Sequence, residues 1–202
     1  ADGVGNNSRF NTPEHVIKDL MSSNHLILTD KDNNGNAVLR SVDLVTLNVT
    51  LFAHISNHTT HIPGITQQKD SGNIFVAVDD WSDLDVGTII MLSYASKALT
   101  YITQKAMRCG LNDGPLLGAE FCTPGALIFL ESDVLLATDW MNGRVRALDL
   151  KKNKTSSICF GLCDNPSYTW EGNYMLSAAI VDDTMYISTA ISLYAVKGEC
   201  SR

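Results

Sequence analysis

The sequence lacks several features that would point to other classes of protein. It has no run of 18 consecutive apolar residues, so it offers no candidate transmembrane helix. Positive charge is scarce: 15 Lys and Arg stand against 22 Asp and Glu, and the net charge of −7 has the wrong sign for a nucleic-acid partner. The content of 14 Gly and 5 Pro excludes a collagen-like or broadly disordered chain. We therefore predict one folded domain over residues 1–202.

An initiating Met and an apolar leader are also missing, since the sequence begins at Ala1. We interpret it as a processed mature chain or a trimmed one. Asn-x-Ser/Thr triplets begin at Asn6, Asn48, Asn57 and Asn153, and we expect N-linked glycans at these positions in a secreted protein. Because Asn, Ser and Thr are common in this chain, chance accounts for part of the count, and the triplets alone are weak support for an extracellular location.

The five cysteines fit an oxidising compartment. Cys109 and Cys122 bracket a short loop rich in turn-forming residues, and we expect them to form a disulfide. Cys159 and Cys163 are a second close pair, which leaves Cys200 as a free thiol or an interchain link. The alternative is that some of the five are buried free thiols. Cys-x-x-Cys does not repeat, so a zinc knuckle is not expected.

An internal repeat organises the chain. Asp2-Gly3 followed by Phe10-Asn11-Thr12-Pro13 recurs as Asp113-Gly114 followed by Phe121-Cys122-Thr123-Pro124, and each matched position is displaced by 111 residues. Short runs of Val, Ile, Leu, Thr and Tyr follow, bounded by Asn, Asp and Gly, which is the pattern of short strands and tight turns. Helix signals are almost absent, and we predict that Glu14 to Ser22 forms a strand and a turn.

Four units account for the chain, and we place them at residues 10–56, 63–104, 121–161 and 172–198. Asp30, Asp79 and Asp139 end the second strand of the first three units, where a carboxylate accepts hydrogen bonds from turn amides, so we predict structural roles for them. The fourth unit has no outer strand, because no apolar run follows Val196. Sheets of this kind cannot bury both faces alone and stack around an axis, which predicts an all-β propeller.

Three sequence elements resemble the NHL-repeat family of β-propellers: Asp-Gly followed by Phe-x-x-Pro, an apolar strand that ends in Thr-Asp, and Asn-Gly-Arg-Val-Arg-Ala-Leu-Asp at Asn142–Asp149. The resemblance is strongest in the first and third units and weak in the fourth. It implies an NHL-type propeller with four recognisable blades, the last of them incomplete. The family includes RNA-binding modules, protein-interaction platforms, extracellular repeat proteins and a peptide-amidating lyase, so the resemblance implies a shape rather than an activity.

NHL propellers commonly close with about six blades, and four would leave a strongly splayed ring. We expect either a rare four-bladed propeller or an open arc that another chain completes. A protein partner or a second copy would then pair with the open edge of the last blade.

Few residue clusters suggest chemistry. His54, His58 and His61 are the one group with metal-like residue types, but they fall in a turn beside Asn57, and we favour polar loop histidines over zinc ligands. Acidic residues that would suit Ca²⁺ occur at Asp79-Asp80, Asp83, Asp85 and Asp182-Asp183, and we favour solvated turns there. The sequence has no Gly-x-Ser-x-Gly elbow, phosphate-binding glycine loop or His-Glu-x-x-His motif. We predict no catalytic residue, no bound metal and no cofactor.

These observations favour a secreted, non-enzymatic propeller that binds other proteins or copies of itself. A metal-dependent lyase or hydrolase of the propeller type is an alternative. All five histidines lie at or before residue 61, which disfavours a metal site assembled by several blades around a central channel. A second alternative is that the chain is a fragment of a longer NHL-repeat protein.

Overall fold

The structure is a computed structural model that describes residues 1–56, 61–80, 86–104, 109–130, 133–158, 175–181, 184–189 and 193–197. Several residues singled out in the sequence lie outside this set: Asn57, His58, Asp83, Asp85, Cys159, Cys163, Asp182, Asp183 and Cys200. The described residues form an almost entirely β structure, as predicted.

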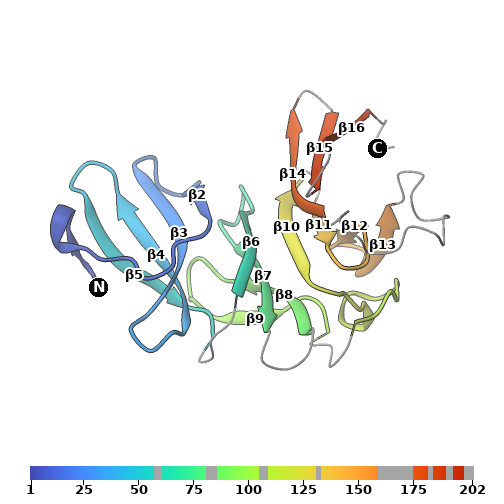
Figure 1. Ribbon diagram of the computed structural model, residues 1–202, viewed down its shortest axis with the longest axis horizontal. Coiled ribbons are helices and arrows are strands. Elements are labelled where there is room, and N and C mark those ends of the chain that lie inside the picture. The colour runs from blue at the N-terminus through green and yellow to red at the C-terminus, as the bar shows by residue number, and fades with distance from the viewer. Residues whose placement is uncertain are drawn as a thin grey trace.

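Four antiparallel sheets, which we number as blades 1 to 4 in chain order, make up the fold (Figure 1). Blade 1 contains β1 (Gly3–Val4), β2 (Val16–Lys18), β3 (His25–Lys31), β4 (Ala37–Asp43) and β5 (Asn48–His54). Blade 2 contains β6 (His61–Gln67), β7 (Ile74–Asp80), β8 (Val86–Leu92) and β9 (Leu99–Tyr101). Blade 3 contains β10 (Pro124–Phe129), β11 (Val134–Asp139), β12 (Arg144–Asp149) and β13 (Lys154–Ile158). Blade 4 contains β14 (Met175–Val181), β15 (Thr184–Thr189) and β16 (Leu193–Lys197).

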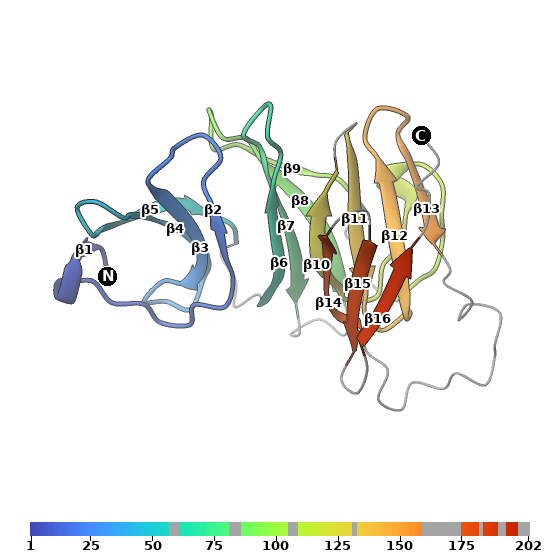
Figure 2. The ribbon, with the colours of Figure 1, turned by 90° about the horizontal axis from the view of Figure 1, so that it is seen from above.

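Each blade packs face to face against the next, so the four form an arc with blades 1 and 4 at its ends (Figure 2). We call the face turned to the preceding blade the leading face, and the face turned to the following blade the trailing face. Because side chains alternate along a strand, neighbouring residues serve opposite faces. Ile27 of β3 packs against blade 2, for example, whereas its neighbour Leu28 belongs to the leading face.

Three hydrophobic clusters fill the spaces between the blades. The first joins Leu39 of blade 1 to Val76 of blade 2, the second joins Phe75 of blade 2 to Leu135 of blade 3, and the third joins Leu136 of blade 3 to Met185 of blade 4. Each cluster is built from both facing sheets, which is why a blade cannot be stable by itself. No helix among the described residues is long and apolar enough to cross a membrane.

The sequence repeat is also a structural repeat. The 3₁₀ turn η1 (Gly5–Asn7) and the 3₁₀ turn η3 (Leu116–Gly118) are displaced by the same 111 residues as the surrounding motif. Gly3 pairs with Val49 of β5, and Gly114 forms the matching bridge to Thr155 of β13. The segment before each of these blades therefore folds back on the outer strand of its own sheet. The N-terminal residues accordingly extend the sheet of blade 1.

Blades 2 and 3 approach closely at their inner strands, where Gly64 of β6 faces Gly125 of β10. A Cβ atom at position 64 would overlap the Gly125 carbonyl oxygen, and backbone cannot swing aside as a flexible side chain does. We expect Gly64→Ala to lower the free energy of unfolding by about 2 kcal/mol or more through overpacking. Urea denaturation followed by tryptophan fluorescence measures the loss.

Gly118→Ala is the matched control, since nothing lies within 4 Å of a Cβ atom added there. It should change the free energy of unfolding by less than about 0.5 kcal/mol. Equal effects from the two substitutions would contradict the inferred contact between the inner strands.

Candidate functional site

The most developed polar site in the described structure surrounds Arg146 in the middle of β12. Its side chain is fully buried, and its Nη1 donates to Asp139 Oδ2 at 2.9 Å and to the Glu120 carbonyl oxygen at 2.8 Å. Asp113 Oδ1 accepts from both Nε, at 3.1 Å, and Nη2, at 2.7 Å, and the Asn112 carbonyl oxygen accepts from Nη2 at 2.9 Å. The guanidinium thus meets an acceptor on every nitrogen, which offsets much of the cost of burying its charge.

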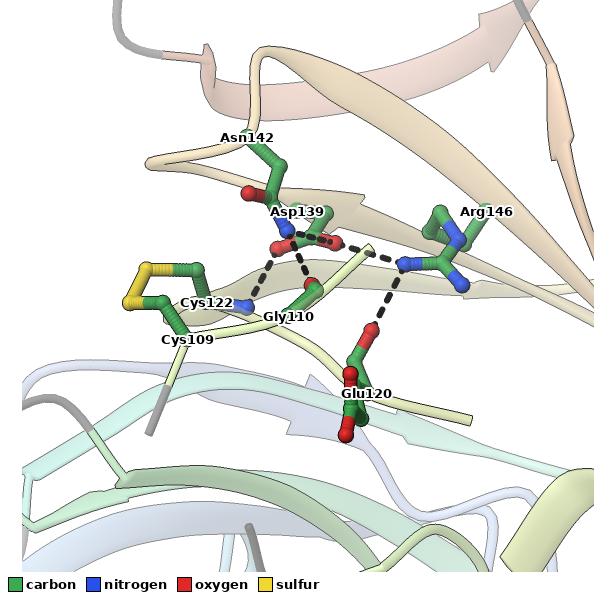
Figure 3. The surroundings of a disulfide bond; sticks show 7 residues. All are labelled: Cys109, Gly110, Glu120, Cys122, Asp139, Asn142 and Arg146. Carbon is green, nitrogen blue, oxygen red and sulfur yellow. Dashed lines mark hydrogen bonds and ion pairs between the residues drawn. A yellow bond between two sulfur atoms is a disulfide. The ribbon is translucent and has the colours of Figure 1, made fainter. Parts of the chain in front are cut away.

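The segment between blades 2 and 3 supplies most of these acceptors, and a disulfide joins Cys109 to Cys122 across it (Figure 3). This is the cysteine pair that the composition of the loop predicts. Cys122 N donates to Asp139 Oδ1, and Asn142 Nδ2 bridges Asp139 Oδ2 and the Gly110 carbonyl oxygen at 2.8 Å each. The disulfide therefore holds both ends of the segment close to the strand that carries Asp139.

Asp139 is surrounded by donors but has no exposed surface. Burial raises the pKa of Asp139 to about 6, against the opposing effects of the Asn142 and Cys122 hydrogen bonds and of the Arg146 charge. The arrangement anchors a loop to a strand, and it presents no nucleophile beside a base. The structural role predicted for Asp139 fits this geometry.

Blade 1 repeats the site around Arg40 of β4. Arg40 pairs with Leu28 across the sheet as Arg146 pairs with Ala137, two residues before the strand-ending aspartate in each case. Its Nη1 lies 3.3 Å from Asp30 Oδ2, and its Nη2 lies 2.8 Å from Asp2 Oδ1. Asp30 Oδ1 accepts from the backbone of the preceding segment, as Asp139 does. The repeated Asp-Gly of the sequence is thus the partner of a buried arginine in both blades.

Blade 2 departs from this pattern and from the alignment of its sequence. The sequence repeat equates Asp79 with Asp30 and Asp139, but Asp79 shares the trailing face of blade 2 with Ala77, whereas Asp30 and Asp139 lie on the leading faces of their blades. The equivalent of Arg40 on the leading face is therefore Thr88, opposite Val78. Its hydroxyl lies 3.2 Å from the Thr103 carbonyl oxygen, so a neutral contact replaces the ion pair.

The metal-like histidines do not assemble in the described structure. His61 Nε2 lies 3.2 Å from Glu14 Oε2, and His54 stands on β5 of blade 1. His15 is half-buried, and this burial lowers its pKa. Across the described ranges, no group of three His, Cys, Asp or Glu side chains is placed to hold a metal ion.

Three of the four predicted glycosylation asparagines are described, and all three are exposed. Asn6 lies in η1, Asn48 begins β5 and Asn153 lies in the turn before β13. Asn153 adopts a left-handed backbone with a φ of 52°, and its Oδ1 accepts from Leu116 N at 3.3 Å. The side chains of Asn6, Asn48 and Asn153 are therefore accessible for the attachment of a glycan.

No protein-family model matches the chain, and no curated protein matches its sequence. Among solved structures, a nidogen/laminin complex superimposes with a TM-score of 0.65 at 14% identity over 93% of this chain and 60% of that one. The extracellular domain of a putative hybrid two component system from B. thetaiotaomicron gives 0.58 at 18% identity over 100% and 24%. An inactive virginiamycin B lyase from Staphylococcus aureus gives 0.56 at 14% identity over 86% and 48%.

The chain therefore spans less than two thirds of the length of each of these structures. At these identities the similarity defines the fold alone. Together with the four stacked antiparallel sheets, it identifies the chain as a β-propeller.

Removing the buried arginine of blade 3 should be costly. Arg146→Gln leaves Asp139 without its buried counter-charge and strips two carbonyl oxygens of a donor, so we expect a loss of about 3–5 kcal/mol in the free energy of unfolding. Arg144→Gln is the control, because the Arg144 side chain is half-buried and lies 3.4 Å from one hydroxyl, Ser157 Oγ. Urea denaturation at pH 7 should show a loss below about 1 kcal/mol for Arg144→Gln. Similar losses for the two variants would argue against the network.

The raised pKa of Asp139 gives a pH dependence with a defined sign. The folded chain keeps this carboxyl protonated between about pH 4 and about pH 6, where the unfolded chain has lost the proton. Its contribution to stability is thus fully present below about pH 4 and is lost as the pH rises through about 6. We expect the stability difference between wild type and Asp139→Asn to fall over this range in urea denaturation.

Asp149→Asn is the control for that titration. Hydrogen bonds from Lys152 lower the pKa of Asp149, so its contribution is present above about pH 4 and is lost as the pH falls. The two variants should therefore show opposite slopes. A pH-independent difference for Asp139→Asn would mean that its pKa is not raised.

Proposed function

We propose that this chain is a secreted, non-enzymatic propeller module of NHL type that binds other proteins, including copies of itself, through the uncovered faces of its end blades. The observation that carries the proposal is that blades 1 and 4 each have one apolar face with no sheet against it among the described residues.

The leading face of blade 1 is the first of these surfaces. Val16 is 60% exposed there, whereas its equivalent in blade 3, Leu127, is 7% exposed because blade 2 covers it. Leu26 is half-buried, while its equivalent Leu135 is fully buried. The same positions that form an interface between blades 2 and 3 are thus apolar and open in blade 1.

The trailing face of blade 4 is the second surface. Leu193, Tyr186 and Val181 are 69%, 36% and 54% exposed on it. Strand β16 forms the outer edge of this sheet among the described residues, and an edge strand offers backbone groups for pairing with a further chain. This is the open edge that the sequence predicts for the last unit.

The two surfaces are complementary in kind, because at every internal interface a trailing face packs against a leading face. A second copy can therefore join head to tail, with its blade 1 against blade 4 of the first. Such heterologous contacts generate a ring if the rotation closes and a filament if it does not. The second candidate for the occupant is further blades of the same polypeptide, which the 60% coverage of the similar chain in the nidogen/laminin complex favours.

An extracellular location is supported by the disulfide and by the exposed glycosylation triplets. Two of the similar structures are a nidogen/laminin complex and an extracellular domain, which fits a module of this kind. Absence of catalysis is supported by the described histidines, which belong to blade 1 and the start of blade 2 and do not converge from several blades. A metal-dependent lyase or hydrolase is the alternative activity, and the similarity to a propeller lyase concerns the fold.

Self-association is measurable directly by static light scattering over a concentration series. We expect wild type to form dimers or larger species, because joining the two faces buries apolar side chains on both sides. Val16→Lys and Leu193→Lys each place a charge on one of the two faces and should weaken association at least about tenfold.

Val45→Lys is the control, since Val45 is 72% exposed in the turn after β4 and lies on neither face. It should leave association unchanged. A wild-type chain that stays monomeric at every concentration would exclude self-assembly. If, in addition, the intact mass of the native protein exceeds that of the 202 residues and their glycans, further blades of the same polypeptide are the occupant.

A further inference from the structure

A pocket of about 490 Å³ opens beside Arg40 on blade 1. The preceding segment, the turn between β3 and β4, and strand β5 form its walls. Arg9, Lys31 and His54 line it together with Arg40, and Asp2 and Asp32 are the acidic residues of the lining. In a chain with a net charge of −7, this is a local concentration of basic side chains.

Arg40 is 4% exposed and is poorly satisfied. Its Nε and Nη2 make no hydrogen bond, although Nη2 is within 2.8 Å of Asp2 Oδ1. The ion pair is therefore close but is not aligned as a hydrogen bond, and Asp2 Oδ2 accepts from Leu51 N instead. One whole edge of a buried guanidinium is left without a directed acceptor, which is costly for a charged donor.

Blade 3 shows a carboxylate at this edge. There the Nε and Nη2 atoms of Arg146 both donate to Asp113 Oδ1, while Asp113 Oδ2 accepts from Ser157 N. The edge of a guanidinium formed by Nε and one Nη matches the two oxygens of a carboxylate, which makes this pairing stronger and more directional than a contact with a single-atom anion.

Three local differences accompany the room beside the arginine of blade 1. Five residues lie between the paired ends Lys31 and Ala37, whereas four lie between Asp139 and Arg144 in blade 3, and the longer turn forms part of the pocket wall. The residue paired with Asp30 is Val38, whereas the residue paired with Asp139 is the longer Arg144. The cross-linked Cys122 of blade 3 is replaced by Asn11 in the repeat. The last two differences remove bulk and restraint from the region that the pocket occupies.

We propose that the pocket beside Arg40 binds a carboxylate group, with its two oxygens on Nε and Nη2 of Arg40. Lys31 and His54 at the rim attract the negative charge, and the Phe10 ring, which lies 5.5 Å from the guanidinium carbon, shields one side of the arginine. The carboxylate belongs either to a free organic acid or to an acidic side chain of a protein partner. The site does not require self-association, so it is testable on the Leu193→Lys variant.

The Nε–Hε resonance of Arg40 in a ¹H–¹⁵N spectrum reports directly on this edge. Titration with sodium acetate, against sodium chloride at equal ionic strength, should shift the Arg40 resonance in a saturable manner that chloride does not reproduce. The Nε–Hε resonance of Arg146 is the internal control. It should not move, because Asp113 already accepts from this edge of the Arg146 guanidinium. Asp2→Asn removes the competing charge beside Arg40 by changing a side chain that is itself 53% exposed, and should tighten acetate binding about fivefold.

A capped glutamate and a short acidic peptide separate the two sources of the carboxylate. Binding of the peptide about tenfold tighter than the capped glutamate supports a protein side chain, and equal affinities support a free acid. The proposal is overturned if acetate leaves the Arg40 resonance unmoved in both the Leu193→Lys variant and its Asp2→Asn derivative, or if chloride gives the same shift. A chain that does not self-associate would still give these results if the carboxylate site exists. Failure of the proposed self-association is therefore distinguishable from failure of the carboxylate site.

Discussion

Every blade of this protein is a thin antiparallel sheet with two apolar faces, and neither face can be left to water without a large loss of hydrophobic stabilisation. The three internal interfaces solve the problem by stacking. They bury residues such as Phe75 and Leu39 completely, while the residues next to them in the same strands serve the opposite interface. The same requirement applies to the exposed outer faces of blades 1 and 4. Because a trailing face packs against a leading face at each internal interface, each outer face is suited to a partner surface of the other kind.

Buried charged side chains have a separate role in blades 1 and 3. Buried arginines at Arg40 and Arg146 hold the segment that precedes a blade against that blade's own strands, and a buried aspartate in each blade accepts hydrogen bonds from backbone amides of the same segment. Hydrophobic stacking therefore joins one blade to the next, whereas charged hydrogen bonds join each of these two blades to its own entry segment. Blade 2 has Thr88 at the matching position, so the ion pair is an addition to the propeller architecture and is not required for it.

The sequence predicts the architecture well because strand length, turn residues and the 111-residue displacement are local signals. It also predicts the bond between Cys109 and Cys122, since the composition of the intervening loop determines the reversal. The face of the sheet on which an aspartate lies was harder to predict: Asp79 resembles Asp30 and Asp139 in its sequence neighbours, but the pairing of β7 with β8 places it on the opposite face of its blade. A one-residue offset between two aligned strands moves a side chain to the other face of the sheet. Such an offset is visible in the cross-strand pairing but not in the similarity of the sequences.

The buried ion pairs of Arg40 and Arg146 could not be predicted from the sequence for a different reason. Arg40 and Asp2 are far apart in the chain, and their contact depends on how the entry segment folds across the outer strand. The repeat itself contained part of the signal, because Asp-Gly precedes both blades and an arginine follows in β4 and in β12, although the separation differs between the two copies. The turn between β3 and β4, which forms part of the pocket beside Arg40, is one residue longer than the turn between β11 and β12. The effect of this difference on the space beside the arginine becomes evident only when the two blades are compared in the structure.

The disulfide across the entry segment of blade 3 also bears on how the protein responds to mechanical load. A tension applied to the two ends of the polypeptide cannot draw out residues 110–121 while Cys109 and Cys122 are joined, because the bond carries the force past that loop. Glu120, Asn112 and Asp113, which supply acceptors to Arg146, belong to this protected loop, whereas the equivalent segment before blade 1 has no cysteine to close it.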